Sequence, residues 1–429
     1  MMEFRPPLFL LTGFCWLVLF ALLGIALFLG MVIGRPLPSV FRILHVHGAL
    51  VGGVAQIILG ALLSFIPPLL LTGRDRPESH PVLYFAVNGG AIGLLAGFAL
   101  GQSALVGAAG LLVLFAFLSL AGETFRQAKT SLVSPPLNLW FYGIALAALF
   151  IGLGMGEALA FRLLPQAHVG QGRLAHLHLN LLLFVTLTIV GTMHNLFPTV
   201  LNGSLYSPRL ARLTFFILPA GSLLLIAGFL LAQVQVQIAA GALFILGTLL
   251  YASNIVQTWI GAGRPRNVSS DHFLMATFFL LAAAITGLLV AINSLWNPPL
   301  MPFGTLHLVA YTHLALVGFI LQTIIGALSH LLPVSLALGR IKSNKKRGPY
   351  LAELTAIAEQ WRPLQVWVLS LGTIGLAFVA TLVWQFNLSS VPVRIATWTA
   401  GGLLAVGVTL FAGKVVRLLL RQPENQERD

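Results

Sequence analysis

The segment His313-Leu-Ala-Leu-Val-Gly318 decides the fold, because its pattern occurs three times with equal internal spacing. In each copy a glycine follows the anchor histidine after 13 residues, and a proline follows that glycine after 7. The three sets are His47, Gly60 and Pro67; His178, Gly191 and Pro198; and His313, Gly326 and Pro333. The anchors are 131 and 135 residues apart, which predicts three repeats of one structural unit.

The sequence around these copies has the composition of a membrane protein. Apolar residues make up 58% of the 429 residues and charged residues only 8%, whereas soluble domains carry about 25% charged residues. A soluble enzyme, a disordered chain and a nucleic-acid binder are thereby excluded. A spanning helix needs about 20 apolar residues. We expect an all-α integral membrane protein with twelve transmembrane helices, near 8–34, 42–72, 81–103, 104–124, 137–161, 174–199, 211–232, 236–260, 271–295, 305–335, 364–385 and 394–421.

The three anchor histidines fall on the second, sixth and tenth of these spans. One anchor in every four spans predicts a pseudo-threefold 4+4+4 arrangement within a single membrane domain, 1–429. The internal repeats cover approximately 1–130, 131–265 and 266–429.

The basic residues predict the orientation. If the spans alternate from a cytoplasmic N-terminus, all but five of the 24 Lys and Arg residues lie on the cytoplasmic side. The five on the outer side are Arg35, Arg42, Arg162, Arg173 and Arg394. The positive-inside rule then places both termini in the cytoplasm. We expect a multi-pass protein of a bacterial or archaeal cytoplasmic membrane. The long loop before the eleventh span carries Lys345-Lys346-Arg347 and the helical pattern 350–361, which indicates an interfacial helix.

A second residue accompanies each anchor, two positions upstream: His45, His176 and Tyr311. Helix positions i and i+2 differ by about 200°, so a His-x-His pair cannot bind one metal with both rings. It can offer one imidazole to each of two cofactors on opposite sides of the helix. Ionisable groups inside a membrane are functional candidates. The alternative is that these histidines are interfacial or join helices by hydrogen bonds.

On these residues the sequence resembles the heme–copper oxidase subunit I superfamily. The tenth span, Val309-Ala-Tyr-Thr-His313 with Gly326 and His330-Leu-Leu-Pro333, is similar to the family pattern A-H-x-H with its following glycine and proline. The sixth span resembles that of the C-type oxidases, and the chain as a whole also resembles the nitric oxide reductases. The spacing is also similar to that of the heme- and copper-associated NnrS family.

The resemblance implies twelve spans and a low-spin b-type heme with two axial imidazoles. His313 would be one axial ligand, and His45 or His47 the other. It implies copper as a further cofactor, with His178 at the copper-binding position and His176 as the other metal-ligand candidate on that span.

The sequence departs from the family at the second site. The family binds its high-spin heme through the first histidine of the tenth-span pair, which here is Tyr311. A tyrosinate can bind heme iron, and His307 lies one helical turn away as a substitute, so one or two hemes are expected. Residues 211–232, the seventh span, contain none of the family's histidines. Stable copper needs about three ligands, so we expect a weak or absent copper site and at most slow oxygen turnover.

Few acidic side chains lie inside the spans. Glu157, near the outer end of the fifth span, is a candidate proton donor or metal ligand; the alternative is a solvated helix end. Glu157 and Tyr311 are the candidate catalytic residues. His80 and His272 lie at the cytoplasmic ends of spans. Gln56 and Gln322 are expected to hold helices together.

Two functions follow from the resemblance. The first is a heme protein in electron transfer or the response to nitric oxide, with copper as a candidate ligand. The alternative is a catalytic reductase of nitric oxide or oxygen, so whether the chain is an enzyme stays open. A cofactor-free transporter is a further alternative. Expected partners are heme, the lipid bilayer, and a cytochrome c-type electron donor or a small partner subunit, with no nucleic acid.

Overall fold

The computed structural model describes residues 4–72 and 78–423. In this part of the chain all regular structure is helical, and twelve helices are long and apolar enough to cross a membrane. The prediction of an all-α protein with twelve spans is therefore confirmed. Arg74, Arg76 and Arg428, which the predicted orientation places in the cytoplasm, lie outside the described residues.

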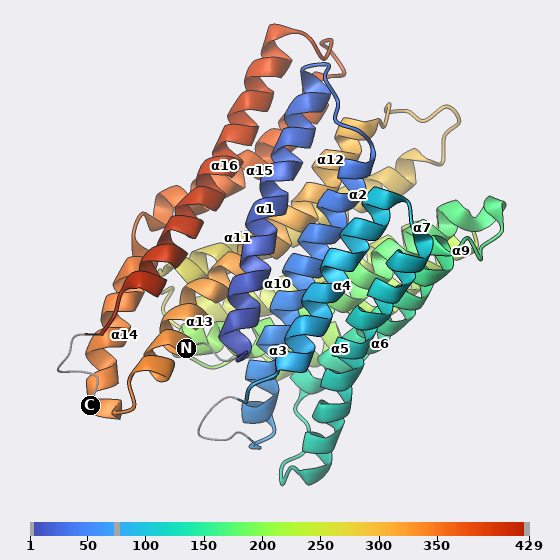
Figure 1. Cartoon of the computed structure of the whole chain (residues 1–429). Coiled ribbons are helices and arrows are strands. Elements are labelled where there is room, and N and C mark those ends of the chain that lie inside the picture. The colour runs from blue at the N-terminus through green and yellow to red at the C-terminus, as the bar shows by residue number, and fades with distance from the viewer. Residues whose placement is uncertain (1–3, 73–77, 424–429) are drawn as a thin grey trace.

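Nine of the twelve spans are single helices (Figure 1). They are α1 (Pro6–Val32), α4 (Pro81–Leu100), α5 (Ser103–Thr130), α6 (Leu137–Ala160), α9 (Pro208–Leu230), α10 (Val234–Gly261), α11 (Val268–Asn293), α15 (Arg362–Leu382) and α16 (Val391–Leu420). The last span packs against the first, which closes the ring of helices. We call the end where α1 ends the outer end, after the orientation that the charges predict.

The second, sixth and tenth spans are each built from several segments. They are α2 (Val40–His47), η1 (Gly48–Ala55) and α3 (Gln56–Leu69); η2 (Gln166–His168), α7 (Val169–His178), η3 (Leu179–Thr186) and α8 (Leu187–Val200); and α12 (Thr305–His313), η4 (Leu314–Leu321) and α13 (Gln322–Arg340). In all three, a π-helical segment of eight residues begins directly after the anchor histidine. The π-helix is rare and frequently marks functional sites.

The repeated glycines are explained by helix packing. Gly60, Gly191 and Gly326 each lie against a buried phenylalanine of the preceding span. A Cβ atom there would be 2.7 Å from Phe9, 2.6 Å from Phe141 and 2.8 Å from Phe273, closer than van der Waals contact allows. The glycine therefore sets how closely each multi-segment span approaches the helix before it.

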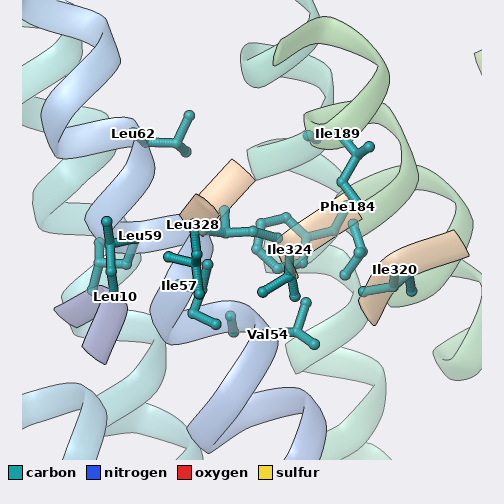
Figure 2. Packing of buried hydrophobic residues seen from close by; sticks show 14 of the residues in the cluster. Leu10, Val54, Ile57, Leu59, Leu62, Phe184, Ile189, Ile320, Ile324 and Leu328 are labelled. Carbon is teal, nitrogen blue, oxygen red and sulfur yellow. The ribbon is translucent and has the colours of Figure 1, made fainter. Parts of the chain in front are cut away.

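The space between the three multi-segment spans is filled with apolar side chains (Figure 2). Val54 and Ile57 of the second span, Phe184 and Ile189 of the sixth, and Ile320, Ile324 and Leu328 of the tenth belong to one buried cluster. The centre of the bundle at this depth is thus lined mainly by apolar side chains, with Thr188, Thr192 and Thr323 among them.

Several helices differ from the sequence prediction in extent. The sixth span begins at Gln166, before the predicted 174, and the tenth ends at Arg340, after the predicted 335. α5 continues to Thr130, past the predicted end at residue 124, because Glu123 bonds to Arg126 and Gln127 and so extends the helix beyond its apolar part. The predicted interfacial helix is α14 (Asn344–Glu359), which begins earlier and includes the basic cluster. Its buried Tyr350 donates to the carbonyl oxygen of Arg421 at 2.7 Å, so α14 is held against the bundle.

Candidate functional site

At the outer end, the rings of His45 and His313 lie opposite one another. Their centroids are 6.3 Å apart and their planes are inclined by only 2°. The Nδ1 atom of His45 lies 2.7 Å from the carbonyl oxygen of Phe20 in α1, and that of His313 lies 2.7 Å from the carbonyl oxygen of Val309. A carbonyl only accepts, so each Nδ1 carries the proton and each neutral ring keeps its lone pair on Nε2.

This arrangement fits two axial ligands of one heme iron. Metal–imidazole bonds are about 2 Å long and a ring nitrogen lies about 1 Å from the ring centre, so two imidazoles on one metal place their centroids about 6 Å apart. Histidine ligands usually donate their other N–H group to a carbonyl or carboxylate, which fixes the ring. In the described part of the chain, no protein group bonds either Nε2 atom. Of the two ligands that the sequence left open, His45 is the one that faces His313.

His47 and His176 repeat these contacts at the next pair of spans. The Nδ1 atom of His47 lies 3.0 Å from the carbonyl oxygen of Ile43, one turn earlier, and its ring contacts Phe98 at 4.6 Å. The Nδ1 atom of His176 lies 2.8 Å from the carbonyl oxygen of Gly152 in α6. Both rings therefore present an Nε2 lone pair.

At the third pair of spans one imidazole is missing. The Nδ1 atom of His178 lies 2.7 Å from the carbonyl oxygen of Leu174, and its ring contacts Phe229 at 4.5 Å. Tyr311 takes the upstream position and lies against α11, where a Cβ atom on Gly287 would be 3.0 Å from the tyrosine hydroxyl. The third repeat thus has a tyrosine where the first two repeats have an upstream histidine.

The remaining ligand candidates contact other parts of the protein. The Glu157 carboxylate occupies a notch on α5 formed by Gly107 and Gly110. The ring centroids of His307 and Trp384, which follows the end of α15, are 5.2 Å apart. The Nδ1 atom of His307 accepts a hydrogen bond from the Gly304 N–H. Among the described residues, no group of three His, Cys, Asp or Glu side chains is placed to hold a metal ion.

The upstream side chains also lie on repeated glycines that the sequence reasoning missed. The His45 ring lies against Gly24 in α1, the His176 ring against Gly156 in α6, and Tyr311 against Gly287 in α11. These glycines are 132 and 131 residues apart, close to the anchor intervals of 131 and 135 residues. That recurrence is the signal that could have identified them, because each upstream ring needs a flat surface on the preceding span.

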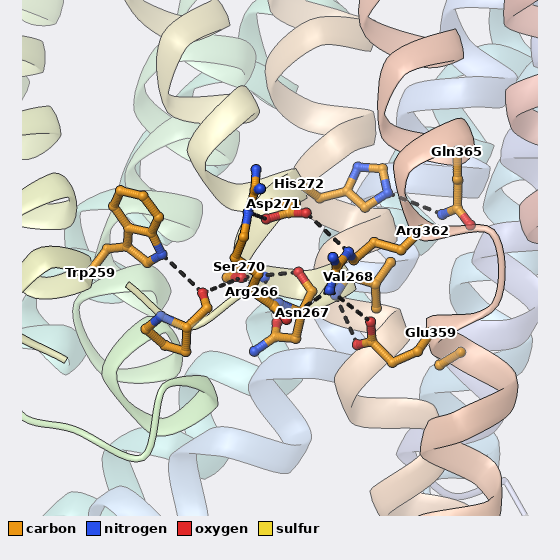
Figure 3. A network of polar contacts seen from close by, with 12 residues as sticks. Trp259, Arg266, Asn267, Val268, Ser270, Asp271, His272, Glu359, Arg362 and Gln365 are labelled. Atoms are coloured by element: carbon orange, nitrogen blue, oxygen red, sulfur yellow. Dashed lines mark hydrogen bonds and ion pairs between the residues drawn. The ribbon is translucent and has the colours of Figure 1, made fainter. Parts of the chain in front are cut away.

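A buried polar network at the inner end of the third repeat was also missed (Figure 3). His272 is fully buried. Its Nδ1 donates to Gln322 at 2.7 Å and its Nε2 accepts from Gln365 at 3.1 Å. Gln322 in turn donates to Ser370 at 2.9 Å. The sequence predicts the start of α11 at 271, close to the observed Val268. The burial of His272 against α13 and α15 has no local sequence signal.

Charged groups lie beside this network, where α11 and α15 begin and α14 ends. Arg362 lies 3.3 Å from Asp271 and 3.8 Å from Glu359. Glu359 also accepts a hydrogen bond from the Val268 N–H at 2.8 Å (Figure 3). Burial raises the pKa of the Glu359 carboxyl, although its hydrogen bond and the neighbouring cations act in the opposite direction. The network fastens α11, α14 and α15 together at the inner end.

Comparison with known proteins supports the fold. No protein-family model and no curated protein matches the sequence. Among solved structures, a heme–copper terminal oxidase, determined by cryo-EM as a dimer, is similar over 97% of this chain and 83% of its own, with a TM-score of 0.68 and 13% sequence identity. The chain therefore has a heme–copper oxidase-like fold, as the three short sequence patterns indicated.

Proposed function

We propose that this protein is a membrane electron-transfer protein that holds a low-spin b-type heme between His45 and His313. The observation that carries the proposal is the pair of parallel imidazole rings, 6.3 Å apart, with both Nδ1 atoms bonded to carbonyls. The bound heme supplies a one-electron redox centre. The protein fixes both rings by hydrogen bonds and keeps the centre inside the membrane domain.

If His45 and His313 both bind the iron, no position would remain there for a gas. The heme would therefore exchange electrons without binding oxygen or nitric oxide. The test is the absorption spectrum of the purified protein, oxidised, reduced, and reduced with carbon monoxide. We expect low-spin bands in the reduced state that carbon monoxide leaves unchanged. A protein purified without heme, and unable to take up added heme, would overturn the proposal and favour a cofactor-free transporter.

The alternative is a reductase of nitric oxide or oxygen, and one observation favours it. The Nε2 atom of His178 and the hydroxyl of Tyr311 have no hydrogen-bond partner in the described part of the chain, so these groups remain available to a second centre. Copper at His178 would need further ligands. His307 and Glu157 are the candidates, but in this structure they contact Trp384 and α5.

We therefore propose that copper binds weakly at His178, if at all, and that gas turnover is slow. The measurement is copper per protein after dialysis against a chelator, together with oxygen and nitric oxide consumption with an artificial electron donor. We expect copper well below one equivalent. Tightly held, stoichiometric copper with fast turnover would establish the reductase and show that the ligands are misplaced.

The setting of this function follows from the charge distribution. We propose a bacterial or archaeal cytoplasmic membrane with both termini in the cytoplasm, which places the histidines in the outer half of the membrane. A cytochrome c-type protein or a small partner subunit on the outer side would then reach the heme most directly. Reduction of the purified protein by a soluble cytochrome c, followed by stopped-flow absorbance, tests this partner.

A further inference from the structure

We infer that the chain holds a second heme between the second and sixth spans, with His47 and His176 as its axial ligands. The inference rests on the proposed function, because it assigns the same class of cofactor to a second pair of histidines. It depends on the way in which the contacts of the first pair recur at the second.

His47 corresponds to His313. Each is the anchor histidine of its span, and each directly precedes a π-helical segment. Each Nδ1 bonds to the carbonyl four residues earlier, at 3.0 Å for His47 and 2.7 Å for His313. The same local backbone therefore fixes both rings in the same tautomer, with the lone pair on Nε2.

His176 corresponds to His45. Each is the upstream residue of its span, and each Nδ1 bonds to a carbonyl of the preceding span, at 2.8 Å for His176 and 2.7 Å for His45. Each ring also lies against a glycine of that span, Gly156 or Gly24. Both members of the second pair thus have the contacts that prepare the first pair for a metal.

The repeat gives the two pairs the same relation across the bundle. His47 and His176 take the anchor and upstream positions of consecutive multi-segment spans, as His313 and His45 do, and the rings of His45 and His313 are 6.3 Å apart. All four histidines are only partly buried. The second pair therefore offers two imidazoles from different spans, with no protein partner on either Nε2 atom among the described residues.

The ligand set selects a heme over a bare metal ion. Two imidazoles alone hold copper weakly, because stable binding needs about three protein ligands. In the described residues, no third His, Cys, Asp or Glu completes a metal site. A heme brings its own equatorial nitrogens, so two axial imidazoles complete its coordination.

The two hemes would be joined through one helix. His45 and His47 are two residues apart, and positions i and i+2 point in directions about 200° apart. The family resemblance places such a bridge on the tenth span, where this chain has Tyr311 in place of the first histidine. The His-x-His pair on the second span provides the bridge here, so electrons would pass between the hemes through α2.

The test is the number of hemes per chain, measured as the pyridine hemochrome against protein concentration. We expect two hemes in the unaltered protein and one in His47→Ala and in His176→Ala. His168→Ala, which changes an exposed histidine just before α7, is the matched control and should keep two. A redox titration of the unaltered protein should show two one-electron waves, and it needs no variant to fold.

A second comparison uses the glycines of α6. Gly156→Val places a side chain against the His176 ring, which a Cβ atom alone would approach to 2.9 Å. Gly154→Ala, two residues earlier, faces open space and is the control. We expect Gly156→Val to lower the affinity for one heme by about 10–100-fold, as for other changes that disturb a positioned ligand. We expect Gly154→Ala to leave both hemes bound.

The outcomes separate this inference from the proposed function. One heme per chain that is lost in His313→Ala but kept in His47→Ala and His176→Ala would overturn the second site and leave the proposed function intact. Copper or another metal without a second heme would also overturn it. No heme at all would overturn both.

Discussion

The outer end of the bundle and the inner end of its third repeat both contain histidines, and their hydrogen bonds differ. His272 at the inner end uses both ring nitrogens, one to Gln322 and one to Gln365. His45 and His313 at the outer end use only Nδ1. The ring of His272 is committed to helix contacts at both nitrogens, whereas His45 and His313 each keep one nitrogen for the cofactor that we propose.

The largest effect on stability is expected at the inner end. His272→Leu leaves the buried amide oxygen of Gln322 and the buried amide nitrogen of Gln365 without partners, and each unsatisfied buried group costs about 1–3 kcal/mol. We predict a loss of about 2–5 kcal/mol in stability, measured by thermal unfolding in detergent, with unchanged heme content in the folded fraction. Loss of heme without loss of stability would mean that His272 belongs to the cofactor site.

The converse change at the outer end should affect cofactor binding more than stability. Gly24→Ala places a Cβ atom against the His45 ring and displaces it. We predict that heme affinity at the first site falls by about 10–100-fold, while the unfolding temperature changes little. Gly402→Ala, at a helical glycine in open space, is the control. Equal heme affinity in both variants would separate His45 from the heme.

These two regions also differ in what the sequence could reveal. The anchor histidines and their upstream partners were identified from spacing alone, because a threefold repeat exposes equivalent positions. The choice of His45 over His47 as the partner of His313 could not be made, since it depends on which face each helix turns to its neighbour. The π-helical segments after the anchors have no local sequence signal, because their backbone differs from an α-helix without any requirement for particular residues.

At the inner network, equivalent sequence positions do not predict equivalent hydrogen bonds. Gln56 and Gln322 occupy the same position after their anchors, and both are fully buried. Gln322 bonds to His272 and Ser370, whereas both amide atoms of Gln56 lack partners in the described part of the chain. Sequence equivalence therefore predicts where a polar side chain lies but not what it contacts, since the contacts come from non-equivalent neighbouring spans.

The smallest effect is expected at the edge of the inner network. Because burial raises the pKa of Glu359, its ionisation is less favourable in the folded protein than in the unfolded chain. Stability should therefore fall as the pH rises from the ordinary pKa of glutamate through the raised value. Glu359→Gln retains an acceptor for the Val268 N–H and should remove this decrease, which unfolding curves at several pH values would detect. An unchanged pH profile would contradict the assignment.

The ligation of heme by the outer pair is tested most directly by His313→Gly, with and without added imidazole. The absorption spectrum is recorded in the reduced state, before and after carbon monoxide. We predict that the variant loses a low-spin component and gains a heme that binds carbon monoxide, and that imidazole restores the original spectrum by filling the cavity of the missing ring. A spectrum identical to that of the unaltered protein, insensitive to carbon monoxide and to imidazole, would contradict the ligation of heme by His45 and His313.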